Sequence, residues 1–93
     1  MSESLLSKER KCWVCGDTRA LHKHHIYMGP NRTQSEYWGC WVYLCPKHHN
    51  KSNQGVHSNH DLDVLLKKTC QREWEKKNGS TERFRAIFGR SYL

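Results

Sequence analysis

The chain has 93 residues, of which only 35% are hydrophobic, and its formal net charge is +7 at pH 7. This composition allows one domain with a core too small to hold the fold alone, so we expect a further source of stability. The charge favours a polyanionic partner, above all nucleic acid. No apolar run is long enough to span a membrane, and the N-terminal residues lack the features of a signal peptide, so we expect an intracellular protein without a membrane partner.

Three segments differ in composition. Residues 1–10 are polar and show no hydrophobic period, which predicts a flexible N-terminal arm. Residues 11–60 are rich in cysteine, histidine and aromatic residues and are expected to form the core of the domain. Residues 61–93 are expected to add basic helices that pack on this core within the same domain.

Two pairs of metal-ligand residues lie in the predicted core. Cys12 and Cys15 are separated by two residues, and so are Cys45 and His48. This spacing lets a tight turn direct both donors of a pair at one tetrahedral ion. The odd number of cysteines, five, suits reduced thiols better than disulfides. We therefore expect a structural Zn²⁺ held by all four residues; the alternative is two unrelated pairs that stay reduced and unligated.

The segment between the two pairs favours a β-hairpin. Residues 41–44, Trp-Val-Tyr-Leu, have the aromatic and β-branched character of a strand. Residues 28–33 contain glycine, proline and asparagine and are expected to be a loop.

Histidines cluster inside and just after this segment. His24 and His25 are adjacent, so on a bent strand one can hold a metal ion while the other acts on a nucleophile. His49 and Asn53 are four residues apart and would share one face of a short helix. Two imidazoles and one amide oxygen would leave open positions on a second divalent ion for water and a phosphate.

A helical period begins after residue 59. Apolar residues form one stripe that predicts a helix over residues 61–77, ended by Gly79; they are Leu62, Leu65, Leu66, Cys70 and Trp74. Ser80 and Thr81 can begin a second short helix with an apolar face made by Phe84, Ile87 and Phe88.

Basic residues suggest where a polyanion would bind. Lys68, Arg72 and Lys76 recur at every fourth position of the longer helix, either as a solvated face or as a contact with the DNA backbone. Lys23 and Arg32 are further candidates for contact with DNA near the histidine cluster.

The joint order of the motifs resembles the HNH endonucleases of the ββα-metal superfamily. The order is Cys-x2-Cys, His-His-Ile, a strand ending in Leu-Cys-x2-His, and His-x3-Asn, over residues 12 to about 57. The resemblance, closest in style to small phage-encoded members, implies a zinc-stapled α+β fold of ββα-metal type that acts in a bacterial cytoplasm.

The resemblance also implies an activity, which is metal-dependent hydrolysis of DNA phosphodiester bonds. His25 matches the general base that deprotonates the attacking water. His24, His49 and Asn53 match the ligands of a catalytic divalent cation, which could be Mg²⁺, Mn²⁺, Ni²⁺ or Zn²⁺. A nuclease of this size that cuts both strands would be expected to form a homodimer.

One position departs from the family pattern. The middle asparagine, which pins the loop that carries the base, would fall at Cys40, and a thiol cannot provide the two-sided hydrogen bonding of an amide. Either another side chain, such as Asn31 or Gln34, orients the loop, or the protein is a catalytically degenerate zinc-binding module. Such a module would bind nucleic acid or protein without cutting.

Overall fold

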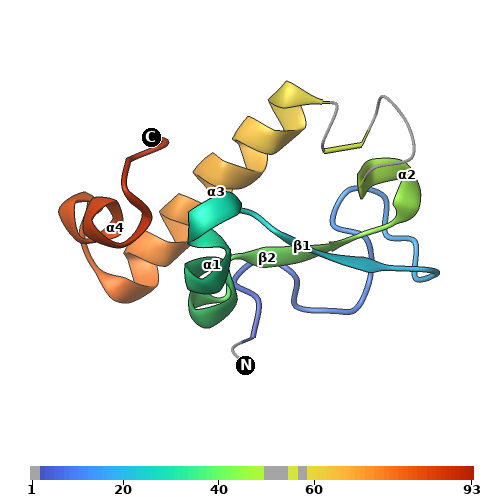
Figure 1. Cartoon of the computed structure of the whole chain (residues 1–93). Helices are drawn as coiled ribbons and strands as arrows, with labels where there is room; N and C mark the ends of the chain where they lie inside the picture. Colours follow the sequence, from blue (N-terminus) through green and yellow to red (C-terminus); the bar gives the residue numbers. More distant parts are fainter. Residues whose placement is uncertain (1–2, 50–54, 57–58) are drawn as a thin grey trace.

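The computed structural model describes residues 3–49, 55–56 and 59–93. Its elements, in chain order, are β1 (His22–His25), η1 (Gly29–Asn31), α1 (Arg32–Trp38), β2 (Trp41–Leu44), α2 (Pro46–His49), α3 (His60–Asn78) and α4 (Thr81–Phe88) (Figure 1). The two strands pair in antiparallel fashion, with His22 opposite Leu44 and His25 opposite Trp41. The protein therefore has a small α+β fold, as the sequence predicted.

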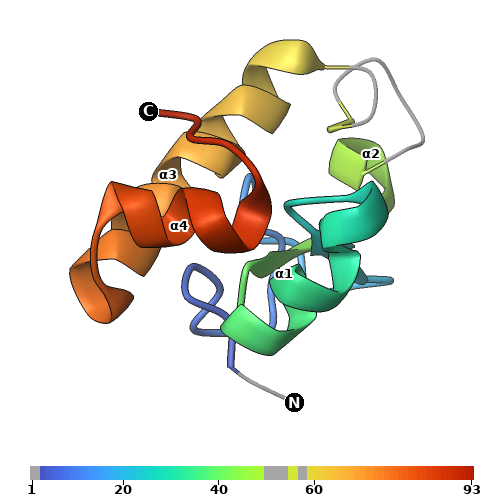
Figure 2. The ribbon, with the colours of Figure 1, turned by 60° about the vertical axis from the view of Figure 1, so that its left-hand side comes forward.

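The helices take different positions around the sheet. α1 connects the strands at one end of the hairpin, and α2 follows β2 at the other end (Figure 1). α4 runs beside the C-terminal half of α3, as both views show (Figure 2). Within the described part of the chain, no helix combines the length and the apolar character needed to cross a membrane.

An aromatic cluster joins the hairpin to the C-terminal helices. Tyr27, directly after β1, lies 5.4 Å from Phe84 and 4.7 Å from Phe88 between ring centroids, and all three side chains are buried. The Tyr27 hydroxyl donates a hydrogen bond of 2.7 Å to the carbonyl of Lys67 in α3. The chain that leaves β1 is therefore anchored on α3 and α4.

The two predicted C-terminal helices are confirmed, and α3 (His60–Asn78) is one residue longer at each end than the predicted range 61–77. The Asn59 side chain accepts a hydrogen bond from the Leu62 amide at the start of α3, and Ser80 does the same for the Arg83 amide at the start of α4. Gly79 ends α3 and Gly89 ends α4.

One residue of the predicted apolar stripe on α3 is misplaced. Leu66, Cys70 and Trp74 are fully buried, whereas Leu65 is 50% exposed. At about 100° per residue, the buried residues lie within one arc of the helix, and Leu65 projects from its flank. Packing on one side of α3 covers that arc and leaves Leu65 in solvent.

Part of the predicted N-terminal arm is packed against the domain. Ser4 and Leu5 are buried, the Leu5 amide donates to the Gly39 carbonyl at 2.8 Å, and the Ser4 hydroxyl donates to the Trp41 carbonyl. Gly39 has φ +75°, and a Cβ atom there would collide with the Glu3 carbonyl. The expectation of a flexible arm therefore does not hold for residues 3–5. Leu5 packs in the core, and a single apolar residue produces no hydrophobic period from which its burial could be predicted.

The expected loop at residues 28–33 is also different in the structure. η1 occupies Gly29–Asn31, and α1 begins at Arg32 and ends at Gly39, whose left-handed conformation stops the helix. A helix of seven residues has little intrinsic stability and depends on tertiary contacts. Its one fully buried residue, Ser35, makes such contacts, which a local sequence pattern does not show.

Candidate metal centre and histidine cleft

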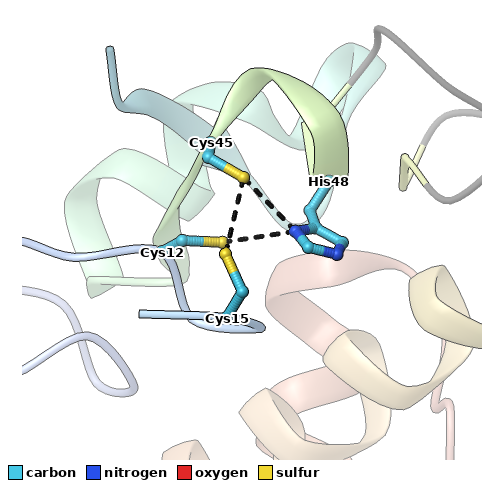
Figure 3. A group of neighbouring side chains, drawn as sticks. All are labelled: Cys12, Cys15, Cys45 and His48. Atoms are coloured by element: carbon cyan, nitrogen blue, oxygen red, sulfur yellow. Dashed lines mark hydrogen bonds between the residues drawn. The ribbon is translucent and has the colours of Figure 1, made fainter. Parts of the chain in front are cut away.

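The four predicted zinc ligands converge on one point (Figure 3). The ligand atoms of Cys12, Cys15, Cys45 and His48 all lie within 4.8 Å of one another. The Sγ atoms of Cys15 and Cys45 are 3.7 Å apart, and His48 Nδ1 lies 3.8 Å from Cys12 Sγ and 3.3 Å from Cys45 Sγ. Ligands of one tetrahedral zinc would be about 3.8 Å apart for two sulfurs and about 3.6 Å apart for sulfur and nitrogen. The cluster could therefore hold a metal ion such as zinc.

Each ligand pair is shaped by a local turn. In the first pair, the Gly16 amide donates to the Cys12 carbonyl at 2.9 Å, and Gly16 adopts the positive φ of +79° that the turn requires. In the second pair, the His48 amide donates to the Cys45 carbonyl at 3.0 Å, within the first turn of α2. The Trp13 amide donates to the Tyr43 carbonyl at 2.8 Å, which ties the first turn to β2.

Backbone groups favour the ionised form of one candidate metal ligand, Cys12. Burial by itself would raise the pKa of the Cys12 thiol, but hydrogen bonds from the backbone at Cys45, Cys15 and Val14 outweigh burial and lower that pKa. The thiolate is the form that binds metal. The local backbone therefore prepares Cys12 for coordination.

A separate open cleft of about 400 Å³ contains most of the predicted catalytic residues. It is lined by Lys23, His24, His25, Met28, Gly29, Arg32 and His49. The ring of buried His24 lies 5.4 Å from the ring of His49 between centroids, at an interplanar angle of 64°. The structure thus brings together His24, His25 and His49, while Asn53 lies outside the described residues.

A fourth histidine, for which the sequence analysis proposed no role, joins this group. His22 Nδ1 is 2.9 Å from His49 Nδ1, and the two rings are nearly perpendicular. His22 and His24 are two residues apart on β1, so both face the same side of the strand, where α2 presents His49. The spacing of His22 and His24 was the available signal for this contact.

The other face of β1 meets an acidic residue that the sequence analysis also missed. Glu36 of α1 lies with Oε1 3.0 Å from His25 Nε2, and its carboxylate is 2.8 Å from the ammonium of Lys23. The Lys23 ammonium also lies 4.2 Å from the centre of the Trp41 ring. The hydrogen bond from Lys23, followed in size by the one from His25, lowers the pKa of the Glu36 carboxyl group. Lys23, predicted to contact DNA, lines the cleft with its charge paired to Glu36.

A cysteine, Cys40, stands where the HNH pattern would place its middle asparagine. Cys40 is fully buried, and a contact with the Cys70 thiol, together with burial, raises its pKa far above the ordinary value. The Cys40 backbone carbonyl, however, accepts a hydrogen bond of 2.9 Å from the Ile26 amide. Cys40 therefore fixes the chain after His25 through its backbone and not through its side chain.

Two-sided hydrogen bonding to that chain comes from Ser35. The Ser35 hydroxyl accepts from the Tyr27 amide at 3.0 Å and donates to the Tyr27 carbonyl at 2.7 Å. Of the two residues expected in this role, Gln34 is exposed, and Asn31 donates its side-chain amide to the Phe88 carbonyl at 2.8 Å. The contact with the backbone after His25 is thus made by another side chain, Ser35 of α1, and not by Asn31 or Gln34, the two candidates named from the sequence.

The predicted basic residues fall into two groups. Arg32 is exposed and lines the cleft with Lys23. Lys68, Arg72 and Lys76 are exposed on α3, whose C-terminal half leads away from α2 (Figure 1). Lys76 forms an ion pair of 3.0 Å with Glu73 of the same helix. A solvated surface and a phosphate contact both agree with these positions, and the salt dependence of DNA binding distinguishes them.

Comparisons of the chain with models of protein families, with curated proteins and with solved structures give no match.

Proposed function

We propose that the protein is a metal-dependent endonuclease of the HNH type that hydrolyses phosphodiester bonds in DNA. The observation that supports this proposal most is the meeting of His24 and His25, from β1, with His49, from α2, at one basic cleft. An antiparallel hairpin followed by a short helix that carries a histidine also agrees with the ββα-metal arrangement that the resemblance implies.

His24 and His49, with Asn53, would hold the catalytic divalent ion. Two imidazoles that bind one ion through nitrogen atoms at about 2.1 Å have ring centroids roughly 5 Å apart. The separation of 5.4 Å between the rings of His24 and His49 fits that requirement. Such an ion would neutralise charge on the scissile phosphate and on the leaving oxygen.

His25 would act as the general base. Imidazole is the side chain best suited to accept a proton near neutral pH. In the proposed reaction a water oxygen forms a bond to phosphorus, the bond from phosphorus to the leaving oxygen breaks, and the water proton passes to His25. Arg32, exposed at the rim of the same cleft, would interact with the DNA phosphates.

The Cys/His cluster would support this site from the other side of α2. His48 points its Nδ1 atom toward the cysteine sulfurs, whereas the next residue, His49, lines the cleft. A zinc ion at the cluster would fix the first turn of α2 and hence the position of His49. With four protein ligands, that ion would have no open position for a reacting water, so its role would be structural.

The test is a nicking assay on supercoiled plasmid with the zinc-loaded full chain. We expect cleavage with Mg²⁺, Mn²⁺ or Ni²⁺ and none after chelation of the second ion. Cleavage that needs no ion beyond the zinc cluster would contradict the proposal. DNA binding without cleavage in the presence of every ion would instead favour the degenerate zinc-binding module.

A further inference from the structure

We infer that Glu36 is the positioning residue for His25, because its carboxylate holds the imidazole in the tautomer that a general base requires. This inference deepens the proposed function and rests on it for the role of His25. The contact on which it stands joins Glu36 Oε1 to His25 Nε2 at 3.0 Å, between α1 and β1.

The strand period explains why these two residues meet. Successive side chains of a strand point to opposite faces. On β1, His22 and His24 face His49 of α2, whereas Lys23 and His25 face Glu36 of α1. One face of the four-residue strand thus presents the proposed metal ligand His24, and on the opposite face Glu36 holds the proposed base His25.

The chemistry of the contact selects one tautomer. An ionised carboxylate can only accept hydrogen bonds, so the neutral imidazole must carry its proton on Nε2 to pair with Glu36. The lone pair is then on Nδ1, which is the nitrogen left to take the proton of the attacking water. After that transfer the imidazolium lies beside a negative charge, and no proton needs to move to Glu36.

Lys23 keeps the carboxylate in the required state. Its ammonium lies 2.8 Å from the Glu36 carboxylate and 4.2 Å from the centre of the Trp41 ring, and its side chain is 24% exposed. A cation at this distance favours the ionised form of Glu36. Lys23, Glu36 and His25 thus form a chain of contacts that ends at the proposed base.

A long-range ¹H–¹⁵N NMR spectrum of the zinc-loaded protein at about pH 8 reports the tautomer of His25. The signals of the His25 ring are assigned by their absence from the spectrum of His25→Ala. We expect the Nε2-protonated form in the wild type. In Glu36→Gln the amide can donate to Nε2, so the Nδ1-protonated form should appear, and cleavage should slow by about 10- to 100-fold with KM for DNA little changed. Glu36→Asp, which keeps the carboxylate, should retain the wild-type tautomer and recover part of the rate. The matched control is Glu82→Gln, an exposed residue of α4, which should change neither readout.

Unaltered imidazole shifts in a folded Glu36→Gln protein would overturn the inference, whatever its rate. A switched tautomer with a full cleavage rate would overturn the positioning role as well. If the wild type does not cut DNA, the proposed function fails, and the tautomer in Glu36→Gln still decides whether Glu36 holds the His25 ring.

Discussion

The Cys/His cluster and the histidine cleft meet at two consecutive residues, His48 and His49, yet they are built in different ways. The ligands of the cluster come in two pairs, each shaped by a turn of a few residues. The cleft takes its histidines from β1 and α2, and its supporting residues, Ser35 and Glu36, from α1. The geometry within each ligand pair therefore depends on a local turn, whereas the orientation of the side chains in the cleft depends on tertiary contacts.

A short sequence motif therefore specifies only part of a functional site. Adjacent histidines on a strand specify the chemical groups that face the cleft, but not the tautomer or the ring orientation of each. The tautomer and the ring orientation depend on the contacts that the histidines make with neighbouring side chains, which are Glu36 for His25 and His22 for His49. Substitutions in the Cys/His cluster should therefore affect folding, whereas substitutions in the cleft should affect the second ion and cleavage.

The largest effect is expected from the Cys/His cluster. Cys45→Ser should lose zinc and with it the folded state, because the small core cannot hold the domain without the bound ion. Metal content and far-ultraviolet circular dichroism measure both losses. Cys70→Ala, which changes a buried cysteine outside the cluster, should keep the zinc. A Cys45→Ser protein that keeps one zinc and melts like the wild type would remove the assignment.

A change in the cleft should affect the second ion and not the first. His49→Ala should keep the structural zinc and the fold but bind Mn²⁺ about 10- to 100-fold more weakly or worse, because it removes a proposed ligand. Isothermal titration of the zinc-loaded protein with Mn²⁺ gives the affinity. The control is Gln34→Ala, an exposed residue of α1. Equal Mn²⁺ affinity in His49→Ala and wild type would place the second ion elsewhere.

Loss of the α1 contact with the hairpin should reduce stability by a smaller amount. Ser35→Ala removes two buried hydrogen bonds to the Tyr27 backbone and should lower the free energy of unfolding by about 1–3 kcal/mol. Denaturant titration of the zinc-loaded protein measures it, with the exposed Thr33→Ala as control. If both variants unfold alike, Ser35 does not hold the chain after β1.

The smallest structural effect is expected on the basic face of α3. Replacing Lys68, Arg72 and Lys76 with glutamine should reduce the magnitude of the log–log salt slope of duplex DNA binding by about 2.7, at about 0.9 for each lost phosphate contact. A thermal melt must show that the fold is intact, because long basic side chains also cover apolar surface. An unchanged slope would assign this face to solvent and leave Arg32, at the cleft, as the phosphate contact.

Much of the fold could be predicted because its signals are local. The strand at Trp41–Leu44, both C-terminal helices and the convergence of four Cys and His side chains on one possible metal site follow from composition, period or spacing. α1 could not be predicted, because its seven residues show no period and its stability comes from Ser35 and Glu36 contacts with the chain around β1. The roles of Glu36 and Ser35 were missed for the same reason.

We propose above that the cleft is a nuclease site in which His25 is the base. The most direct test of this proposal is the single-turnover rate of plasmid nicking by zinc-loaded His25→Ala and wild type, with the same divalent ion at saturation. We expect His25→Ala to keep its zinc, fold and DNA affinity while the rate falls by a factor on the order of 100 to 10,000. Cleavage by folded His25→Ala at the wild-type rate would contradict it.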